Sequence, residues 1–180
     1  MVACLHPEAG SRTIAPMRVL VVFDTTYGNT ARIARAMGEA LAAAGADSVE
    51  VRPVALVGPL DLAGVDLLVV GGPTQRRGPS RTLAGWLGEL GKGSLAGVRA
   101  ATFDTRYRMP KLLTGSAAEG AAGRLRRAGC SLVVPPESFF MGREQPPVGE
   151  KRRHATEAPE PGEEERAAAW ARALVAGLDG

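Results

Sequence analysis

The segment Val19-Leu-Val-Val-Phe-Asp-Thr-Thr-Tyr-Gly-Asn-Thr30 decides the fold, because a strand, a polar loop and the start of a helix follow one another in it. Val19–Phe23 is an unbroken apolar run, which is typical of a strand covered on both faces, as in a parallel sheet. From about Asn29 to Ala44 the apolar residues recur with the period of a helix. The apolar face of this helix is formed by Ile33, Met37, Leu41 and Ala44.

The loop between this strand and this helix predicts an anion-binding site. The first amide groups of a helix have no internal acceptor and carry the positive end of its dipole, so they bind phosphate readily. The hydroxyl groups of Thr25, Thr26 and Thr30 are placed to donate to the same phosphate. The alternative is an ordinary strand-to-helix turn with threonine as the N-cap. Three threonines in so short a loop favour the phosphate site.

This loop resembles the phosphate loop of flavodoxins, in which a Ser/Thr-x-Thr-Gly-x-Thr pattern wraps the phosphate of FMN. Thr25, Gly28 and Thr30 match that pattern. Tyr27 stands where flavodoxins usually carry threonine, and a tyrosine there is similar to the flavodoxin-like quinone reductases. The resemblance implies FMN as the cofactor. It assigns the phosphate to Thr25, Thr26, Tyr27, Gly28, Asn29 and Thr30.

The rest of the chain alternates strands and helices. A second strand around Val49 and Val51 alternates apolar and polar residues, which is typical of a strand at the edge of a sheet. The other expected strands are Val65–Gly71, Val98–Phe103 and Cys130–Val134, the last ended by Pro135-Pro136, and the other expected helices are Pro79–Leu90, Ser116–Ala128 and Glu163–Ala176. The pattern predicts an α/β fold with a doubly wound, five-stranded parallel sheet of flavodoxin-like order 2-1-3-4-5.

The length of 180 residues suits one domain, which we expect to span residues 17–180. Residues 1–16 have no periodic pattern and are expected to form a disordered extension. Residues 143–162 are rich in Glu, Arg and Pro and carry no apolar stripe. We expect them to form a mobile surface loop inserted before the last helix.

Two further loops follow strands three and four, and the flavodoxin resemblance implies that both border the flavin ring. In the second loop it assigns FMN contacts to Pro73, Thr74, Gln75, Arg76 and Gly78. In the third loop it assigns them to Asp104, Thr105, Arg106 and Tyr107. Tyr107 is the aromatic residue of these loops and is the candidate for stacking on the ring. The alternatives are a plain Gly/Pro turn and a tyrosine that only packs against a neighbouring loop.

The two ring loops carry Arg76, Arg77, Arg106 and Arg108, whereas many flavodoxins have strongly acidic surfaces. A basic rim favours an acidic redox partner protein or a small electron acceptor. No basic run is interleaved with aromatic residues, so nucleic acid is not expected as a partner.

Neither a membrane-spanning run nor a signal peptide is visible, and the two cysteines, Cys4 and Cys130, have no metal-ligand or CxxC spacing. These features predict a cytoplasmic protein without a membrane or metal site. Cys130 begins an apolar run and is expected to be a buried thiol.

Three functions remain open. The favoured one is an FMN-binding electron carrier, because the chain is short and shows no second nucleotide site. The others are an FMN-dependent NAD(P)H:quinone-type oxidoreductase and a flavodoxin-like interaction module that has lost FMN. No acid, base or nucleophile constellation is visible, as expected where a cofactor carries the chemistry. A receiver domain would need an aspartate at Gly71-Gly72, and the glycine motif of Rossmann domains and the G-x-S-x-G motif of hydrolases are both absent.

Overall fold

The computed structural model describes residues 16–75, 77–143 and 157–177. Almost all of the expected extension and most of the expected loop at 143–162 lie outside these residues. The strands are β1 Arg18–Phe23, β2 Ser48–Pro53, β3 Leu67–Gln75, β4 Gly78–Pro79, β5 Arg99–Arg106, β6 Ser131–Leu132, β7 Glu137–Arg143 and β8 Glu157–Pro159. The helices are α1 Asn29–Ala43, α2 Arg81–Glu89, α3 Lys111–Thr114, α4 Ala117–Ala128 and α5 Glu163–Ala176, with 3₁₀ turns η1 Val54–Leu56 and η2 Pro59–Leu62.

One sheet organises the domain, in the order β2-β1-β3-β5-β7-β8. The pairings of β1 with β2 and β3, of β3 with β5 and of β5 with β7 are all parallel. The five principal strands therefore have the predicted order 2-1-3-4-5, with β7 as the fifth. The alternating second strand, β2, lies at the edge of the sheet, as predicted.

The last part of the sheet corrects the sequence prediction. Only Ser131–Leu132 of the expected strand at 130–134 pairs with β5. Proline has no amide donor for a sheet, so Pro135-Pro136 interrupts the pairing, but the chain resumes it in β7 beside the end of β5. Part of the expected loop is also a strand, because β8 pairs antiparallel with Met141–Arg143 of β7.

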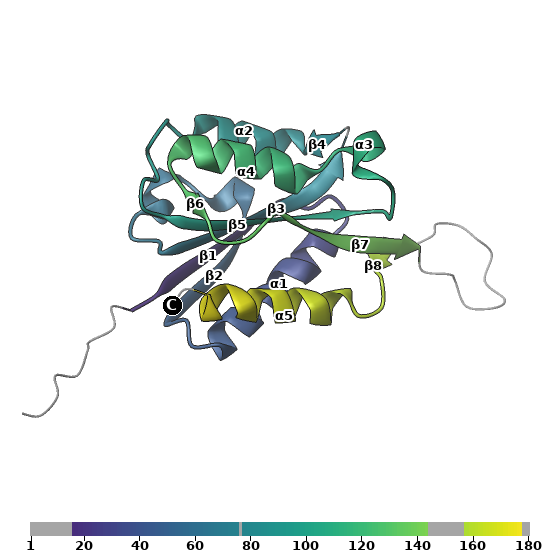
Figure 1. The fold of residues 1–180 in the computed structure, drawn as a ribbon, viewed down its shortest axis with the longest axis horizontal. Coiled ribbons are helices and arrows are strands. Elements are labelled where there is room, and N and C mark those ends of the chain that lie inside the picture. The colour runs from purple at the N-terminus through teal and green to yellow at the C-terminus, as the bar shows by residue number, and fades with distance from the viewer. Residues whose placement is uncertain (1–15, 76, 144–156, 178–180) are drawn as a thin grey trace, which may run out of the picture.

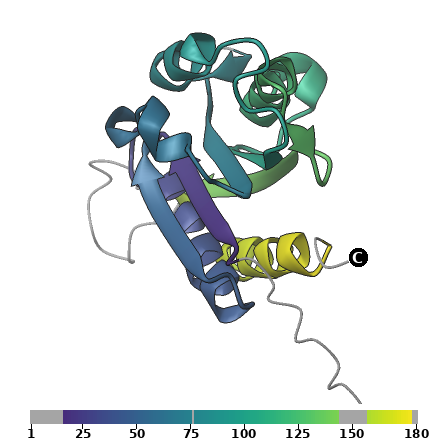
Figure 2. The same cartoon turned by 90° about the vertical axis from the view of Figure 1, so that its left-hand side faces the viewer.

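Helices cover both faces of the sheet, α1 and α5 on one and α2 and α4 on the other (Figures 1 and 2). Successive residues of β1 point to opposite faces of the sheet. Val19 and Val21 belong to the core under α1 and α5, and Leu20 and Val22 belong to the core under α2 and α4. The predicted helix face on α1 is fully buried at Ile33, Met37 and Leu41. Within the described residues, no helix is long and apolar enough to cross a membrane.

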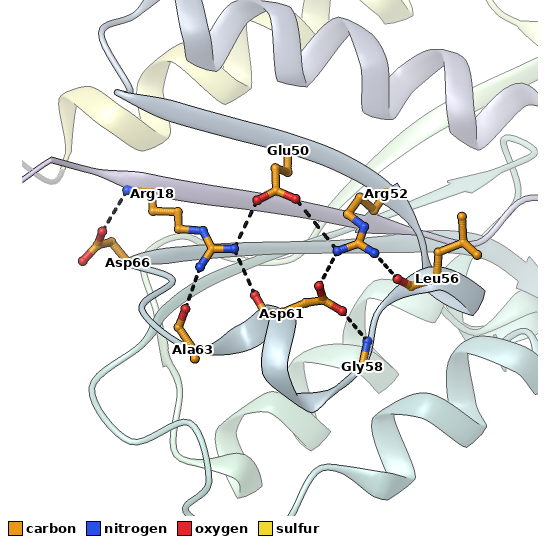
Figure 3. A network of polar contacts seen from close by, with 8 residues as sticks. All are labelled: Arg18, Glu50, Arg52, Leu56, Gly58, Asp61, Ala63 and Asp66. Carbon is orange, nitrogen blue, oxygen red and sulfur yellow. Dashed lines mark hydrogen bonds and ion pairs between the residues drawn. The ribbon is translucent and has the colours of Figure 1, made fainter.

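At the edge of the sheet, a network of charged residues connects β1 and β2 with the turn η2 (Figure 3). The Arg18 guanidinium contacts Glu50 at 3.1 Å and donates to the carbonyl oxygen of Ala63 at 2.7 Å. Arg52 pairs with Asp61 at 2.5 Å. The second oxygen of Asp61 accepts the amide proton of Gly58 at 2.7 Å. Asp61 thus fixes the turn η2 to the polar face of β2.

These contacts predict how pH affects stability. The amide of Gly58 and the guanidinium of Arg52 hold the pKa of the Asp61 carboxyl below its usual range. A carboxyl with a lowered pKa in the folded state stabilises the fold above about pH 4 and loses that contribution as the pH falls further. We expect Asp61→Asn to lower the free energy of unfolding at pH 7 and to differ less from the parent near pH 3.

Denaturant titrations at the two pH values measure this difference. Glu89→Gln, at an exposed carboxylate of α2, is the control for the loss of one negative charge. A difference between Asp61→Asn and parent that stays the same at pH 3 and pH 7 would contradict the assigned role of the Asp61 charge.

Candidate functional site

The loops that follow β1, β3 and β5 meet at the carboxyl ends of these strands, at the α3 end of the molecule (Figure 1). They enclose a cavity of about 420 Å³. Most of the residues predicted for FMN lie in its wall. These are Thr25, Thr26, Tyr27, Asn29, Thr30, Pro73, Thr74, Gln75, Thr105, Arg106 and Tyr107.

At one end of the cavity the threonine hydroxyls are arranged so that they can still donate. Thr25 Oγ1 accepts the amide proton of Gly28 at 3.0 Å, and Thr26 Oγ1 accepts a proton from the Gln75 side chain at 3.0 Å. Each of these hydroxyls keeps its own proton for another acceptor. Thr30 and Thr105 share one hydrogen bond between their hydroxyls at 2.8 Å, which leaves one further proton available.

The start of α1 supplies backbone donors at the same place. Gly28 precedes the helix with φ at 88°, a conformation that favours glycine. Among the described residues, the amide groups of Thr26, Tyr27, Asn29 and Thr30 have no protein acceptor. The alternative reading, a threonine N-cap, is wrong, because no side chain caps α1. Amides, hydroxyls and a helix N-terminus are groups that suit an anion.

The cavity wall also has an apolar part, to which Pro73 and Tyr107 of the predicted loops contribute. Further residues there were not predicted from the sequence, namely Arg77, Met109, Leu113, Thr114, Met141 and Glu157. The Tyr107 hydroxyl donates to the carboxylate of Glu157, which comes from β8. Tyr107 is 39% exposed. The pairing of β7 with β5 brings Met141 to the site and the pairing of β8 with β7 brings Glu157, and no local sequence signal marks either residue.

Three predicted residues do not line the cavity, and a fourth is not described. Asp104 is fully buried and does not line the cavity. Its Oδ2 accepts protons from Thr74 at 3.0 Å, from Ser116 at 2.5 Å and from the amide of Ala118 at 3.2 Å. Gly78 pairs with Gln75 in a hairpin behind the cavity wall, and Gly28 shapes the first loop without lining it. Arg76 lies outside the described residues.

The arginines of the two ring loops have different roles. Arg106 lines the cavity, is only 8% exposed and donates to the carbonyl oxygens of Gly115, at 3.0 Å, and Met109. Arg108 turns away: it pairs with Glu160 at 2.7 Å and lies 4.2 Å from the centre of the Phe140 ring. Arg108 therefore does not line the cavity. Arg77 lines the cavity and is exposed.

Comparison with known proteins agrees with this geometry. The family model for flavodoxin matches residues 21–170. The chain belongs to the flavodoxin family. No curated protein sequence matches it.

Solved structures show the same fold. A flavodoxin from the domain Archaea is 17% identical with a TM-score of 0.65, and the match covers 91% of this chain and all of that one. Flavodoxin 1 from Bacillus cereus is 16% identical with a TM-score of 0.67, over 88% and 97% of the two chains. Rubredoxin oxygen:oxidoreductase from Desulfovibrio gigas is 17% identical with a TM-score of 0.65, and the match covers 91% of this flavodoxin but 37% of that longer chain.

Flavodoxins bind FMN, and the residues of this cavity fit that cofactor. The unpartnered amides and hydroxyl protons at the start of α1 suit a phosphate, and among the described residues no carboxylate lines that end. The apolar wall with Tyr107, Met109 and Leu113 suits a flat aromatic ring.

The described part of the chain shows no second reactive centre. No group of histidine, cysteine or acidic residues there could hold a metal ion. Cys130 is buried as predicted, and burial raises the pKa of its thiol to about 11. A thiol with so high a pKa is a poor nucleophile near neutral pH.

The placement of Asp104 leads to a test. We expect Asp104→Ala to destabilise the fold by about 3 kcal/mol, because buried donors that lose their acceptor cost about 1–3 kcal/mol each. Asp104→Asn keeps an acceptor oxygen and should cost less. Flavin affinity, measured by fluorescence titration, should change little in Asp104→Asn. A large loss of FMN affinity in that variant at unchanged stability would return Asp104 to the binding site.

Proposed function

We propose that this flavodoxin binds FMN in the cavity and acts as an electron-transfer carrier. One observation carries the proposal. The loop before α1 holds amide and hydroxyl donors that the described residues leave without acceptors, and they converge at one end of the cavity. A phosphate group with its negative charge satisfies such donors better than water does.

Bound FMN supplies the chemistry, since it takes up and releases one or two electrons. The protein contributes binding and orientation. Thr25, Thr26 and Thr30 would hold the phosphate, and Pro73 and Tyr107 would hold the ring. Glu157 fixes Tyr107 through its hydroxyl, so this side chain is oriented before the cofactor binds.

The mouth of the cavity supports a carrier. Tyr27 is 77% exposed and Met109 49% exposed at its rim, so an electron partner reaches the site without any rearrangement of the chain. The carboxylate of Glu157 is engaged by Tyr107. Among the described residues we find no acid–base pair directed into the cavity. As part of the proposal we place the protein in the cytoplasm, because Cys130 is a free buried thiol.

The phosphate assignment is tested with two flavins. The double variant Thr25→Val/Thr30→Val removes two donors to a charged acceptor, at about 1.5–3 kcal/mol each, so FMN affinity should fall at least about tenfold. Riboflavin lacks the phosphate and should bind parent and variant alike. Thr82→Val, at an exposed threonine of α2 that does not line the cavity, is the control. If the parent binds riboflavin as tightly as FMN, the phosphate site is wrong.

Carrier and enzyme differ in what they consume. The FMN-loaded protein should pass electrons from dithionite to a one-electron acceptor such as ferricyanide and should oxidise NAD(P)H only slowly when a quinone is present. Rapid, saturable NAD(P)H oxidation would identify an oxidoreductase instead. A protein that binds no FMN in the fluorescence titration would be an interaction module.

A further inference from the structure

The large apolar side chains that remain exposed are concentrated on one surface. Within the described residues there are seven such side chains, and Tyr27, Tyr107, Met109 and Leu113 among them line the mouth of the cavity. Leu112 stands next to them on α3 and is 91% exposed, whereas Leu113 is 60% exposed. Grouped apolar exposure of this kind marks an interaction site, unlike single exposed residues.

Specific contacts hold α3 in place. Arg106 donates to Gly115 at 3.0 Å and to Met109, so its guanidinium joins the two ends of the segment that carries α3. Gly115 forms a bridge with Arg77 and has φ at 68°. A Cβ atom at Gly115 would lie 2.1 Å from the carbonyl oxygen of Arg77. The segment that carries the exposed Leu112 and Leu113 is therefore held in place by specific contacts.

Positive charges border the same surface. Arg77 and Arg81 are exposed, and within the described residues neither forms an ion pair. Lys111, at the start of α3, forms an ion pair with Glu119 at 3.5 Å, and both side chains are about half exposed. Arg77, Lys111 and Arg124 line a shallow second cavity beside α3, with Glu119 as the acidic residue in its wall. The border of the surface is thus predominantly cationic.

We propose that this α3 surface is a docking site for an acidic redox protein with an apolar centre. We define it by Tyr107, Met109, Leu112 and Leu113 together with Arg77, Arg81 and Lys111. The leucines would pack against the apolar centre, and the cations would attract its acidic border. A protein seated on this surface also covers the mouth of the FMN cavity. The redox character of the partner rests on the proposed function, whereas its acidity rests on the cations described above.

The probe is cytochrome c with succinylated lysines, in which acidic groups surround an exposed haem edge. Unmodified cytochrome c, which is basic, is the counter-probe. We expect the acidic form to bind the full-length protein at about 20 mM salt, to be released at about 500 mM, and to bind much more tightly than the basic form. Calorimetry or sedimentation measures this binding with and without FMN, so a protein that fails to bind FMN is recognised separately from one that fails to dock.

Matched variants separate the contributions of the surface. Leu112→Ser should weaken binding of the acidic probe about tenfold, whereas Leu60→Ser, at a leucine 90% exposed on η2, should not. Arg81→Gln/Lys111→Gln should weaken binding and reduce its salt dependence. Arg126→Gln/Arg127→Gln, which removes the same charge near the other end of α4, should change both less.

Each of the following results would overturn the proposal. They are no binding of the acidic probe at low salt, equal binding of the two probes, equal effects of Leu112→Ser and Leu60→Ser, and equal effects of the two double variants. A concentration-dependent dimer that Leu112→Ser abolishes would also overturn it, because this surface would then bind a second copy of the chain.

Discussion

The structure depends on the register of its three central strands. Phe23 of β1, Gly71 of β3 and Phe103 of β5 lie side by side across the sheet. Gly71 is required in this row, because a Cβ atom there would lie 2.2 Å from the ring of Phe103. Asp24 then donates its amide proton to Gly71 at 3.0 Å, just where β1 ends. β1 ends at this row, whereas β3 and β5 continue beside each other to Gln75 and Arg106. The first loop therefore lies next to the last residues of β3 and β5, and together they form the cavity wall at the carboxyl ends of the strands.

Two aspartates near the carboxyl ends of β1 and β5 bind the N-cap serines of helices. Asp24 accepts the hydroxyl proton of Ser80, the N-cap of α2, and Asp104 accepts that of Ser116, the N-cap of α4. Both carboxylates thus serve the helical layer on one face of the sheet. The wall of the cavity keeps only Glu157 as an acid among the described residues, at the ring end. The phosphate end therefore has donors without a competing negative charge, which a site for an anion requires.

The sequence was sufficient wherever the signal is local. The apolar run and the helix period around Thr25 predicted the first strand and α1, and the threonines of the loop between them lie in the cavity wall. Sequence reasoning failed where the position of a residue depends on contacts with segments far away in the chain. Met141 reaches the cavity through the pairing of β7 with β5, and Glu157 through the pairing of β8 with β7. Arg108 pairs with Glu160, which is distant in the sequence. Asp104 follows the loop pattern, but its burial depends on where α4 packs. Pro135-Pro136 was expected to end the last strand, but it only interrupts the pairing with β5, which resumes in β7.

Arg106 shows why the cavity and the α3 surface should be considered together. Its guanidinium lines the cavity, and the same group holds the carbonyl oxygens of Met109 and Gly115 at the two ends of the α3 segment. A buried cation without a carboxylate partner is costly, and the described residues give Arg106 only backbone oxygens. Carbonyl dipoles offset part of this cost, and an electron-rich ligand in the cavity would offset more. Arg106 thus contributes both to the position of α3 and to the charge of the cavity wall, so a substitution at Arg106 alters both.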